Sequence, residues 1–364
     1  MAEKIRLGLI GASAKGTWSA RSHLPAVRAS ADVELTAVCT TRAESAEAAR
    51  QAWGARMAFD DYRRMIASPE IDAVAVVVRV PSHYAPAKAA LEAGKHVYCE
   101  WPLGRTTAEA VELAALAKQK GLVTAVGLQA RVNPAIMHMK EQLDAGFVGE
   151  VTAVRVGLMR EGVLSRPSSR TWQRDASLGA NTLTIANGHT VDAMRFVVGD
   201  FREVGAVVAT QIKQWFETDT KKFVDVTAPD HILVNGRLAN GAVASSHVAA
   251  VPYAGSGYSM EIYGREGTLV VTGEESPQLS VLSLQGCKQG NTLAAIAVPA
   301  RLTFATSGTP AGDATNVGQM YTLFAEAIRA GKSRQPTFDT AVELHRLIDA
   351  MTKASEENRA IALG

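Results

Sequence analysis

The 364-residue chain has little cysteine: Cys39, Cys99 and Cys287 are widely separated. No CxxC pair or Cys/His spacing typical of structural zinc occurs, so we expect neither a disulfide framework nor a bound metal. The sequence also lacks an apolar run of about 20 residues that could span a membrane. Its start, MAEKIRLGLIGAS, has no basic region followed by an apolar one, as a signal peptide would. We therefore predict a cytoplasmic protein with no membrane partner.

Charge of one sign is not in excess either. Lys and Arg total 38 against 36 for Asp and Glu, which leaves a net charge of +2. Such a balance argues against direct binding of nucleic acid, which normally requires a strongly basic surface. Apolar residues make up 47% of the chain and charged residues 20%, as in ordinary globular proteins. The length is sufficient for two domains with cores of their own.

Short apolar segments alternate with helical ones in the first third of the chain. Helices are expected between the apolar segments. The first of these helices contains Pro25, which should limit or kink the helix. Strands are predicted at 5–11, 33–39, 73–78, 96–99 and 123–127, with helices at 18–30, 44–53, 84–93 and 108–120. Alternation of this kind predicts βαβ units and a doubly wound parallel sheet of the Rossmann type.

The pattern changes near residue 150, where β-branched segments follow one another with few helices between them. Strands are predicted at 151–157, 203–209, 230–235, 241–249, 259–263 and 267–272, with helices at 134–145 and 188–198. A turn-rich segment, 304–316, precedes two closing helices at 317–330 and 340–358. We predict a Rossmann domain over 1–127 and an α/β domain over 128–364 with a large, mostly antiparallel sheet. The closing helices are candidates for packing back on the first domain.

A glycine-rich segment, Gly11-Ala-Ser13-Ala-Lys15-Gly16, lies between the first strand and the first helix. Gly11 would permit the tight turn, Gly16 close packing, and the helix N-terminus would receive a pyrophosphate. Ser13 replaces the middle glycine of the usual fingerprint, so the alternative is an ordinary strand–helix turn.

The end of the second strand bears on the choice between NAD and NADP. An acidic residue there binds the ribose 2′-hydroxyl, and a basic one accepts a 2′-phosphate. The chain has Thr41 and Arg42, with no carboxylate before Glu44. We predict NADP with NAD still possible in principle; the alternative for Arg42 is that it simply begins a surface helix.

Three further segments follow predicted strands or begin a helix. Pro81 and His83 would line the nicotinamide side, although His83 is as well explained as a cap of the next helix. Trp101 can donate a hydrogen bond but cannot serve as an acid or base, so it would stack on a sugar or nicotinamide ring, or simply pack. His189 is suited to general acid–base catalysis near pH 7; the alternative is an imidazole held by backbone groups.

Taken in order, several motifs resemble the glucose–fructose oxidoreductase/inositol dehydrogenase (Gfo/Idh/MocA) family. They are HLPAV, VPSHY, Glu-x-Pro, LQARVNP, GFVGEV, GHTVD, YGREGTL and PTFDTAVELHRLIDA. GASAKGTWSARSHLPAV, EWPL and PDHILVNG are most similar to the fungal galactose-gene repressor branch. The resemblance implies a nicotinamide dinucleotide, a sugar-like ligand, and a homodimer or homotetramer formed through the C-terminal sheet.

The resemblance also implies two sets of site residues. For the cofactor they are Gly11, Ser13, Lys15, Gly16, Thr41, Arg42, Pro81, His83, Glu100, Trp101, Pro102 and Gln129. For the substrate they are Trp101, Arg131, Trp172, Arg174 and His189, of which His189 would be catalytic.

Two departures from the catalytic family pattern leave the function open. Trp101 stands where the family has a lysine, and Ile185 where it has an aspartate, so only His189 remains of that catalytic set. The first hypothesis is an oxidoreductase acting on a sugar-like or polyol substrate with an altered acid–base set. The second is a non-catalytic regulator that binds a dinucleotide and a partner protein. The third is a redox-neutral enzyme that cleaves a bond with its cofactor unchanged overall.

Overall fold

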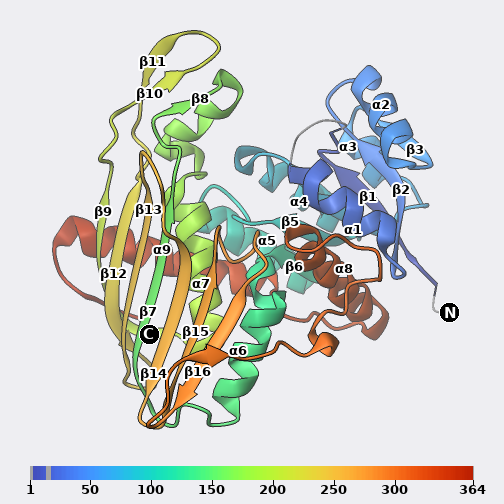
Figure 1. Ribbon diagram of the computed structural model, residues 1–364. Helices are drawn as coiled ribbons and strands as arrows, with labels where there is room; N and C mark the ends of the chain where they lie inside the picture. Colours follow the sequence, from blue (N-terminus) through green and yellow to red (C-terminus); the bar gives the residue numbers. More distant parts are fainter. Residues whose placement is uncertain (1–2, 14–17, 364) are drawn as a thin grey trace. The chain divides into compact units, whose positions relative to one another are not determined.

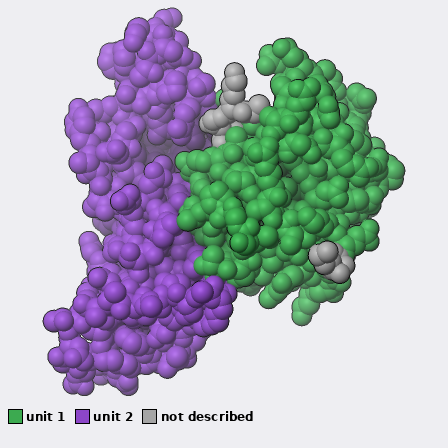
Figure 2. Space-filling model, turned by 45° about the vertical axis from the view of Figure 1, so that its right-hand side comes forward, with its two compact units in different colours: residues 1–129, 303–343 green, residues 130–302, 344–364 purple. Residues whose placement is uncertain are grey.

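The computed structural model describes residues 3–13 and 18–363, which form two compact units. The described residues of Met1–Gln129 and Thr303–Glu343 form unit 1, and those of Ala130–Leu302 and Leu344–Gly364 form unit 2 (Figure 2). Each unit has a sheet of its own. No helix in the described part of the chain is both long and apolar enough to cross a membrane.

Unit 1 contains a six-stranded sheet in the order β3-β2-β1-β4-β5-β6, with every neighbouring pair parallel (Figure 1). Apolar residues run almost without interruption through β1, β2 and β4 because both faces of the sheet are covered. This confirms the predicted Rossmann fold. The strands are β1 (Ile5–Ile10), β2 (Val33–Cys39), β3 (Met57–Phe59), β4 (Ala73–Val76), β5 (His96–Glu100) and β6 (Thr124–Gly127).

The helices of unit 1 differ from prediction at several places, and the short helical segments Tyr62–Ile66 and Val80–Ser82 were not predicted. The single helix expected at 18–30 is a π-helical turn, η1, followed by a short α-helix, α1. Pro25 lies in the first turn of α1, directly after the π-helical turn, where an irregularity of the helix is expected. Helix α8 begins at Asp313, so the predicted loop at 304–316 is shorter at its end. The helices are η1 (Ser19–His23), α1 (Leu24–Ala29), α2 (Ala43–Trp53), α3 (Tyr62–Ile66), η2 (Val80–Ser82), α4 (Tyr84–Glu92), α5 (Thr107–Gln119) and α8 (Asp313–Ala330).

Unit 2 contains a nine-stranded sheet in the order β17-β16-β15-β14-β7-β13-β12-β9-β18. Neighbouring strands are antiparallel except β7 and β13, which confirms the predicted mostly antiparallel sheet. The strands are β7 (Val151–Arg160), β9 (Phe201–Ala209), β12 (His231–Leu238), β13 (Val243–Ala250), β14 (Gly257–Gly264), β15 (Gly267–Gly273), β16 (Ser283–Lys288), β17 (Ala294–Ala295) and β18 (Ile361–Ala362).

Helices α6 and α7 pack against one face of this sheet, on strands β7, β13, β15 and β16 (Figure 1). A small second sheet in the order β11-β10-β8 extends unit 2. Its strands are β8 (Ser165–Arg166), β10 (Gln214–Glu217) and β11 (Lys222–Asp225). The helical segments are η3 (Gln129–Val132), α6 (Pro134–Asp144), η4 (Ser168–Arg174), η5 (Ala176–Leu178), η6 (Thr182–Ala186), α7 (Asn187–Val198), η7 (Ala300–Leu302) and α9 (Phe338–Glu357), the last of which crosses the boundary between the units.

Candidate functional site

The turn after β1 requires glycine at its first position. Gly11 has a φ of +93°, and a Cβ there would lie 2.1 Å from the carbonyl oxygen of Val77. The Gly11 N–H donates to the carbonyl of Cys39, and the Ser19 hydroxyl donates to the carbonyl of Gly11. Ser13 is half-buried, whereas Lys15 and Gly16 lie outside the described residues. The described part of the turn thus fits the strand–turn–helix geometry that receives a dinucleotide pyrophosphate.

Arg42 lies at the N-cap of α2, directly after β2. Its side chain and that of Thr41 are exposed, and no carboxylate pairs with the Arg42 guanidinium among the described residues. The Thr40 hydroxyl shares a 2.7 Å hydrogen bond with Ser45, which shapes the start of the helix. An exposed, unpaired guanidinium at a helix N-terminus is available to an anion such as a 2′-phosphate.

Carboxylates reach the same edge of the sheet from β3, which the sequence analysis did not anticipate. The Thr40 N–H donates to the carbonyl of Phe59, so the ends of β2 and β3 are adjacent. Burial, and then the nearby Asp61 and Asp60, raise the pKa of Cys39 to about 12. Each aspartate already has an arginine neighbour on α3 within 4 Å. These carboxylates keep NAD as the alternative to NADP.

His83 lies at the N-cap position of α4. Its side chain makes no hydrogen bond as a cap of α4, and it is 1% exposed. Its Nδ1 lies 2.7 Å from the carbonyl oxygen of Pro102, and its Nε2 lies 3.0 Å from that of Val78. Burial lowers the pKa of the imidazole. His83 therefore ties the end of β4 to the turn after β5, and its ring nitrogens are not open to a cofactor.

Glu100, the last residue of β5, is the centre of a buried polar network. Its carboxylate accepts hydrogen bonds from Gln129 Nε2 (2.9 and 3.0 Å), Tyr98 Oη (3.1 Å) and His23 Nε2 (3.0 Å). His23 Nδ1 lies 2.7 Å from the hydroxyl of Tyr321 on α8. Burial is the main cause that raises the pKa of Tyr98 and of Tyr321, so both phenols stay neutral. The network joins η1, β5, α8 and residue 129 around one carboxylate.

The turn after β5 is held closely against this network. Trp101 is 4% exposed, and the peptide bond between Trp101 and Pro102 is cis. A Cβ on Gly127, at the end of β6, would lie 2.7 Å from a Glu100 carboxylate oxygen, so glycine is needed there. Pro81 lies in η2, within the segment that leads from β4 into α4. These residues line the carboxyl ends of β4, β5 and β6, where ligands of open α/β sheets bind.

His189 lies in the first turn of α7, in unit 2, and is 5% exposed. The π-helical turn η6 precedes it, and Asn181 begins that turn with a capping box to Thr184. π-Helical turns are frequent at functional sites. Ile185, which takes the place of the family aspartate, is half-buried in η6. His189 thus lies at the start of a helix, and residue 185 in the preceding turn is not acidic.

Arg131, for which a substrate role is predicted, has a structural partner within unit 2. Its Nε and one terminal nitrogen donate to the two carboxylate oxygens of Asp192 on α7, at 2.8 and 2.7 Å. Arg131 is 8% exposed and Asp192 0%. This buried, bidentate pair fastens η3 to α7 within unit 2. Because both of these guanidinium donors bind Asp192, we do not include Arg131 among the proposed substrate residues.

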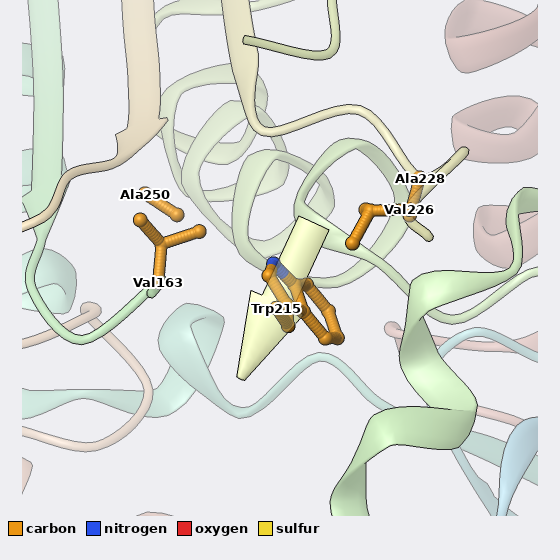
Figure 3. Close-up of a cluster of buried hydrophobic side chains, with 5 residues drawn as sticks. All are labelled: Val163, Trp215, Val226, Ala228 and Ala250. Atoms are coloured by element: carbon orange, nitrogen blue, oxygen red, sulfur yellow. The ribbon is translucent and has the colours of Figure 1, made fainter. Parts of the chain in front are cut away.

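Trp172 and Arg174 lie on η4, beside the small sheet of unit 2, and both are half-buried. One terminal nitrogen of Arg174 donates to the carbonyl of Asp225 on β11 at 3.0 Å. The small sheet has a core of its own, in which Trp215 lies between Val163 and Ala250 on one side and Val226 and Ala228 on the other (Figure 3). The Arg166 guanidinium covers the Trp215 ring at 4.1 Å. Packing of this kind holds η4 in place.

Sequence reasoning missed His23, Tyr98 and Tyr321 as parts of the site. The spacing of His23 from the other histidines indicates no site, and Tyr98 and Tyr321 belong to no motif of the sequence. Their signal is tertiary, because the three residues are far apart in sequence and their rings contact one another only in the folded unit. Among the described residues, no group of three His, Cys, Asp or Glu side chains is arranged to hold a metal ion.

Comparison with known proteins gives two consecutive family matches. Residues 5–128 match the oxidoreductase family with an NAD-binding Rossmann fold (Gfo/Idh/MocA), and residues 134–273 match the Gal80p C-terminal domain. Dehydrogenase aclE of Aspergillus oryzae is 28% identical, over 99% of this chain and 98% of the relative. The galactose/lactose metabolism regulatory protein GAL80 of Kluyveromyces lactis is also 28% identical, over 79% of this chain and 68% of the relative.

The fold also has counterparts among solved structures. A levoglucosan dehydrogenase in complex with NADH and L-sorbose matches with a TM-score of 0.86 at 23% identity, over 100% of both chains. At that identity the likeness concerns the fold alone. The first family match contains the six-stranded sheet, and the second contains most strands of the nine-stranded sheet. This protein therefore belongs to the Gfo/Idh/MocA family of NAD-binding oxidoreductases, with a Gal80p-like C-terminal domain.

Proposed function

We propose that this protein is an NAD(P)-dependent oxidoreductase that transfers hydride between nicotinamide and a sugar-like or polyol substrate. The observation that carries the proposal is the extent of similarity to a dehydrogenase. The alignment with aclE covers 98% of that dehydrogenase, whereas the alignment with GAL80 covers 68% of the regulator. In the sequence alignment about a third of the regulator thus has no counterpart here, which favours the enzyme.

The proposed cofactor is NADP, with NAD as the alternative. Gly11 and Ser13 belong to the pyrophosphate turn, and Arg42 with Thr41 would receive the 2′-phosphate. Trp101 and Gln129 lie at the carboxyl ends of β5 and β6. When bound, the nicotinamide supplies the chemistry of hydride transfer. The chain's own residues bind the cofactor, orient the substrate and move the accompanying proton.

The proposed substrate residues are Trp101, Trp172, Arg174 and His189. Indole rings suit the apolar faces of a sugar, and a guanidinium suits its hydroxyl groups or a carboxylate. A hydroxyl proton must leave as hydride departs from the same carbon. Neither Trp101 nor Ile185 can accept that proton. The imidazole of His189 is therefore the proposed acid–base group.

Replacing His189 by alanine tests this assignment. Loss of a positioned general base should lower kcat by roughly 10²–10⁴-fold, with dinucleotide affinity nearly unchanged. The measurement is the rate of nicotinamide reduction with a panel of sugars, polyols and sugar acids, together with cofactor titration by tryptophan fluorescence. His247→Ala is the matched control, since His247 lies half-exposed on β13 and should leave the rate intact. Undiminished turnover in His189→Ala would refute the assignment.

A non-catalytic regulator is the second candidate. The match of residues 134–273 to the Gal80p C-terminal domain favours it, as do Trp101 and Ile185 at two family catalytic positions. Proven dinucleotide binding without reduction of any substrate would favour this candidate or the redox-neutral enzyme. Product formation with cofactor in trace amounts, and no net change in its absorbance, would identify redox-neutral bond cleavage.

A further inference from the structure

The Glu100 carboxylate is an anion held rigidly at the carboxyl end of β5. Hydrogen bonds from Gln129, Tyr98 and His23 hold the carboxylate in one place. The Glu100 carboxylate lies against Gly127, at the end of β6. A Cβ added at Gly127 would lie only 2.7–2.8 Å from the carboxylate atoms, so the carboxylate can occupy this place only because residue 127 is glycine. The charge therefore has a fixed place before any ligand arrives.

The sheet order puts this charge on the nicotinamide side. Strand order β3-β2-β1-β4-β5-β6 reverses between β1 and β4, and a dinucleotide lies across that switch point. The ribose that the end of β2 recognises belongs to the adenosine half, so the nicotinamide half extends over β4 and β5. Glu100 ends β5, and its side chain is 10% exposed while that of His23 is fully buried. The carboxylate is thus the more accessible member of the pair.

We propose that Glu100 makes unit 1 discriminate between the oxidation states of its cofactor, in favour of the oxidised form. The oxidised nicotinamide ring carries a positive charge and the reduced ring is neutral, so a fixed carboxylate attracts only the former. Trp101, where the family pattern has a lysine, adds no positive charge to this turn. Glu100 thus determines the specificity for the oxidation state of the dinucleotide. The inference rests on the dinucleotide binding of the proposed function.

Glu100→Gln tests the inference without any assay of turnover. Glutamine preserves the size of the side chain and removes the charge. The variant should weaken binding of the oxidised dinucleotide roughly tenfold relative to the reduced one, because a unit charge several ångströms away contributes on the order of 1 kcal/mol or more. Dissociation constants of both forms are measured by calorimetry on the full chain.

Tyr98→Phe is the matched control. It removes one donor to the same carboxylate, at 3.1 Å, and leaves the charge in place, so the ratio of the two dissociation constants should not change. An equal loss for both forms in Glu100→Gln, or a changed ratio in Tyr98→Phe, would overturn the inference.

The unaltered protein provides a second measurement in case Glu100→Gln does not fold. It should bind the oxidised dinucleotide more tightly than the reduced one. Tighter or equal binding of the reduced form overturns the inference and leaves the proposed oxidoreductase standing. Absence of binding by either form would instead refute the proposed function, and the inference with it.

Discussion

At position 101 a buried indole stands where the family pattern has a lysine, and at 185 an isoleucine stands where it has an aspartate. Both changes remove groups that can exchange a proton. Gly11, at the start of the dinucleotide turn, has the positive-φ conformation that the turn needs. At the scale of single residues, two groups able to exchange a proton are absent, while the glycine that begins the dinucleotide turn is present.

Arg42→Ala should weaken NADP binding far more than NAD binding. A guanidinium on a phosphate contributes about 1.5–3 kcal/mol, so we expect a loss of roughly 10- to 100-fold for NADP alone. Fluorescence titration with both dinucleotides measures it. Arg56→Ala is the control, because Arg56 is another exposed arginine of unit 1 that already pairs with Glu70. Equal weakening of both dinucleotides would point instead to the carboxylates at the end of β3 and to NAD.

At the scale of elements, the Arg131–Asp192 pair fastens η3 to α7, the helix that carries His189. Removing one member of a buried ion pair leaves the other charge without compensation. Arg131→Met should accordingly lower the free energy of unfolding by about 3–5 kcal/mol. Urea denaturation measures it, and the double variant Arg131→Met/Asp192→Leu should recover much of the loss.

Lys140→Ala provides the exposed counterpart of that experiment. The Lys140–Asp144 pair is partly exposed and one helical turn apart, and such pairs contribute only about 0.3–0.5 kcal/mol.

A normal stability of Arg131→Met together with a raised KM would restore Arg131 to the substrate set and contradict the structural role.

At the scale of the whole molecule, one face of the nine-stranded sheet is covered by α6 and α7, and the other exposes apolar side chains. Val207 on β9 and Leu233 on β12 are directly opposite each other. Val243 on β13 and Tyr263 on β14 both pair with Ala153 of β7, so their side chains lie on one face of the sheet. Their exposures are 57%, 42%, 56% and 39%. Apolar surface of this kind is typical of an interface. We propose that the face joins copies of the chain in a homodimer or homotetramer.

Val207→Glu combined with Leu233→Glu should convert the assembly to monomers. The two introduced carboxylates would lie opposite each other and would have to be desolvated when two copies associate, which makes association strongly unfavourable. Sedimentation measures the state of assembly, and unchanged cofactor binding shows that unit 1 is intact. Val281→Glu is the control, because Val281 is 70% exposed and precedes β16. A monomeric unaltered protein, or an assembly that survives the double change, would contradict the proposal.

Regular elements followed closely from sequence where hydrophobic burial is uniform. The segments 33–39 and 96–99 became β2 and β5 because buried parallel strands are apolar throughout. Most of the missed strands have two to four residues, too few to show a period; they are β3, β8, β10, β11, β17 and β18. The six-residue β16 was also missed, because its residues do not alternate clearly between apolar and polar. Arg131 was assigned to the substrate because nothing in the sequence pairs it with Asp192, sixty-one residues away.

The sequence by itself determined the class of fold, the glycine turn and the loss of the family lysine and aspartate, since these depend on residue type and local order. Only the tertiary structure decided what Glu100, His83 and Arg131 contact, and hence which charges are buried and which stay accessible. The reason is physical: a side chain's charge, pKa and reach depend on neighbours that distant segments supply. His23, Glu100 and Tyr321 make one network only because β5, η1 and α8 pack together.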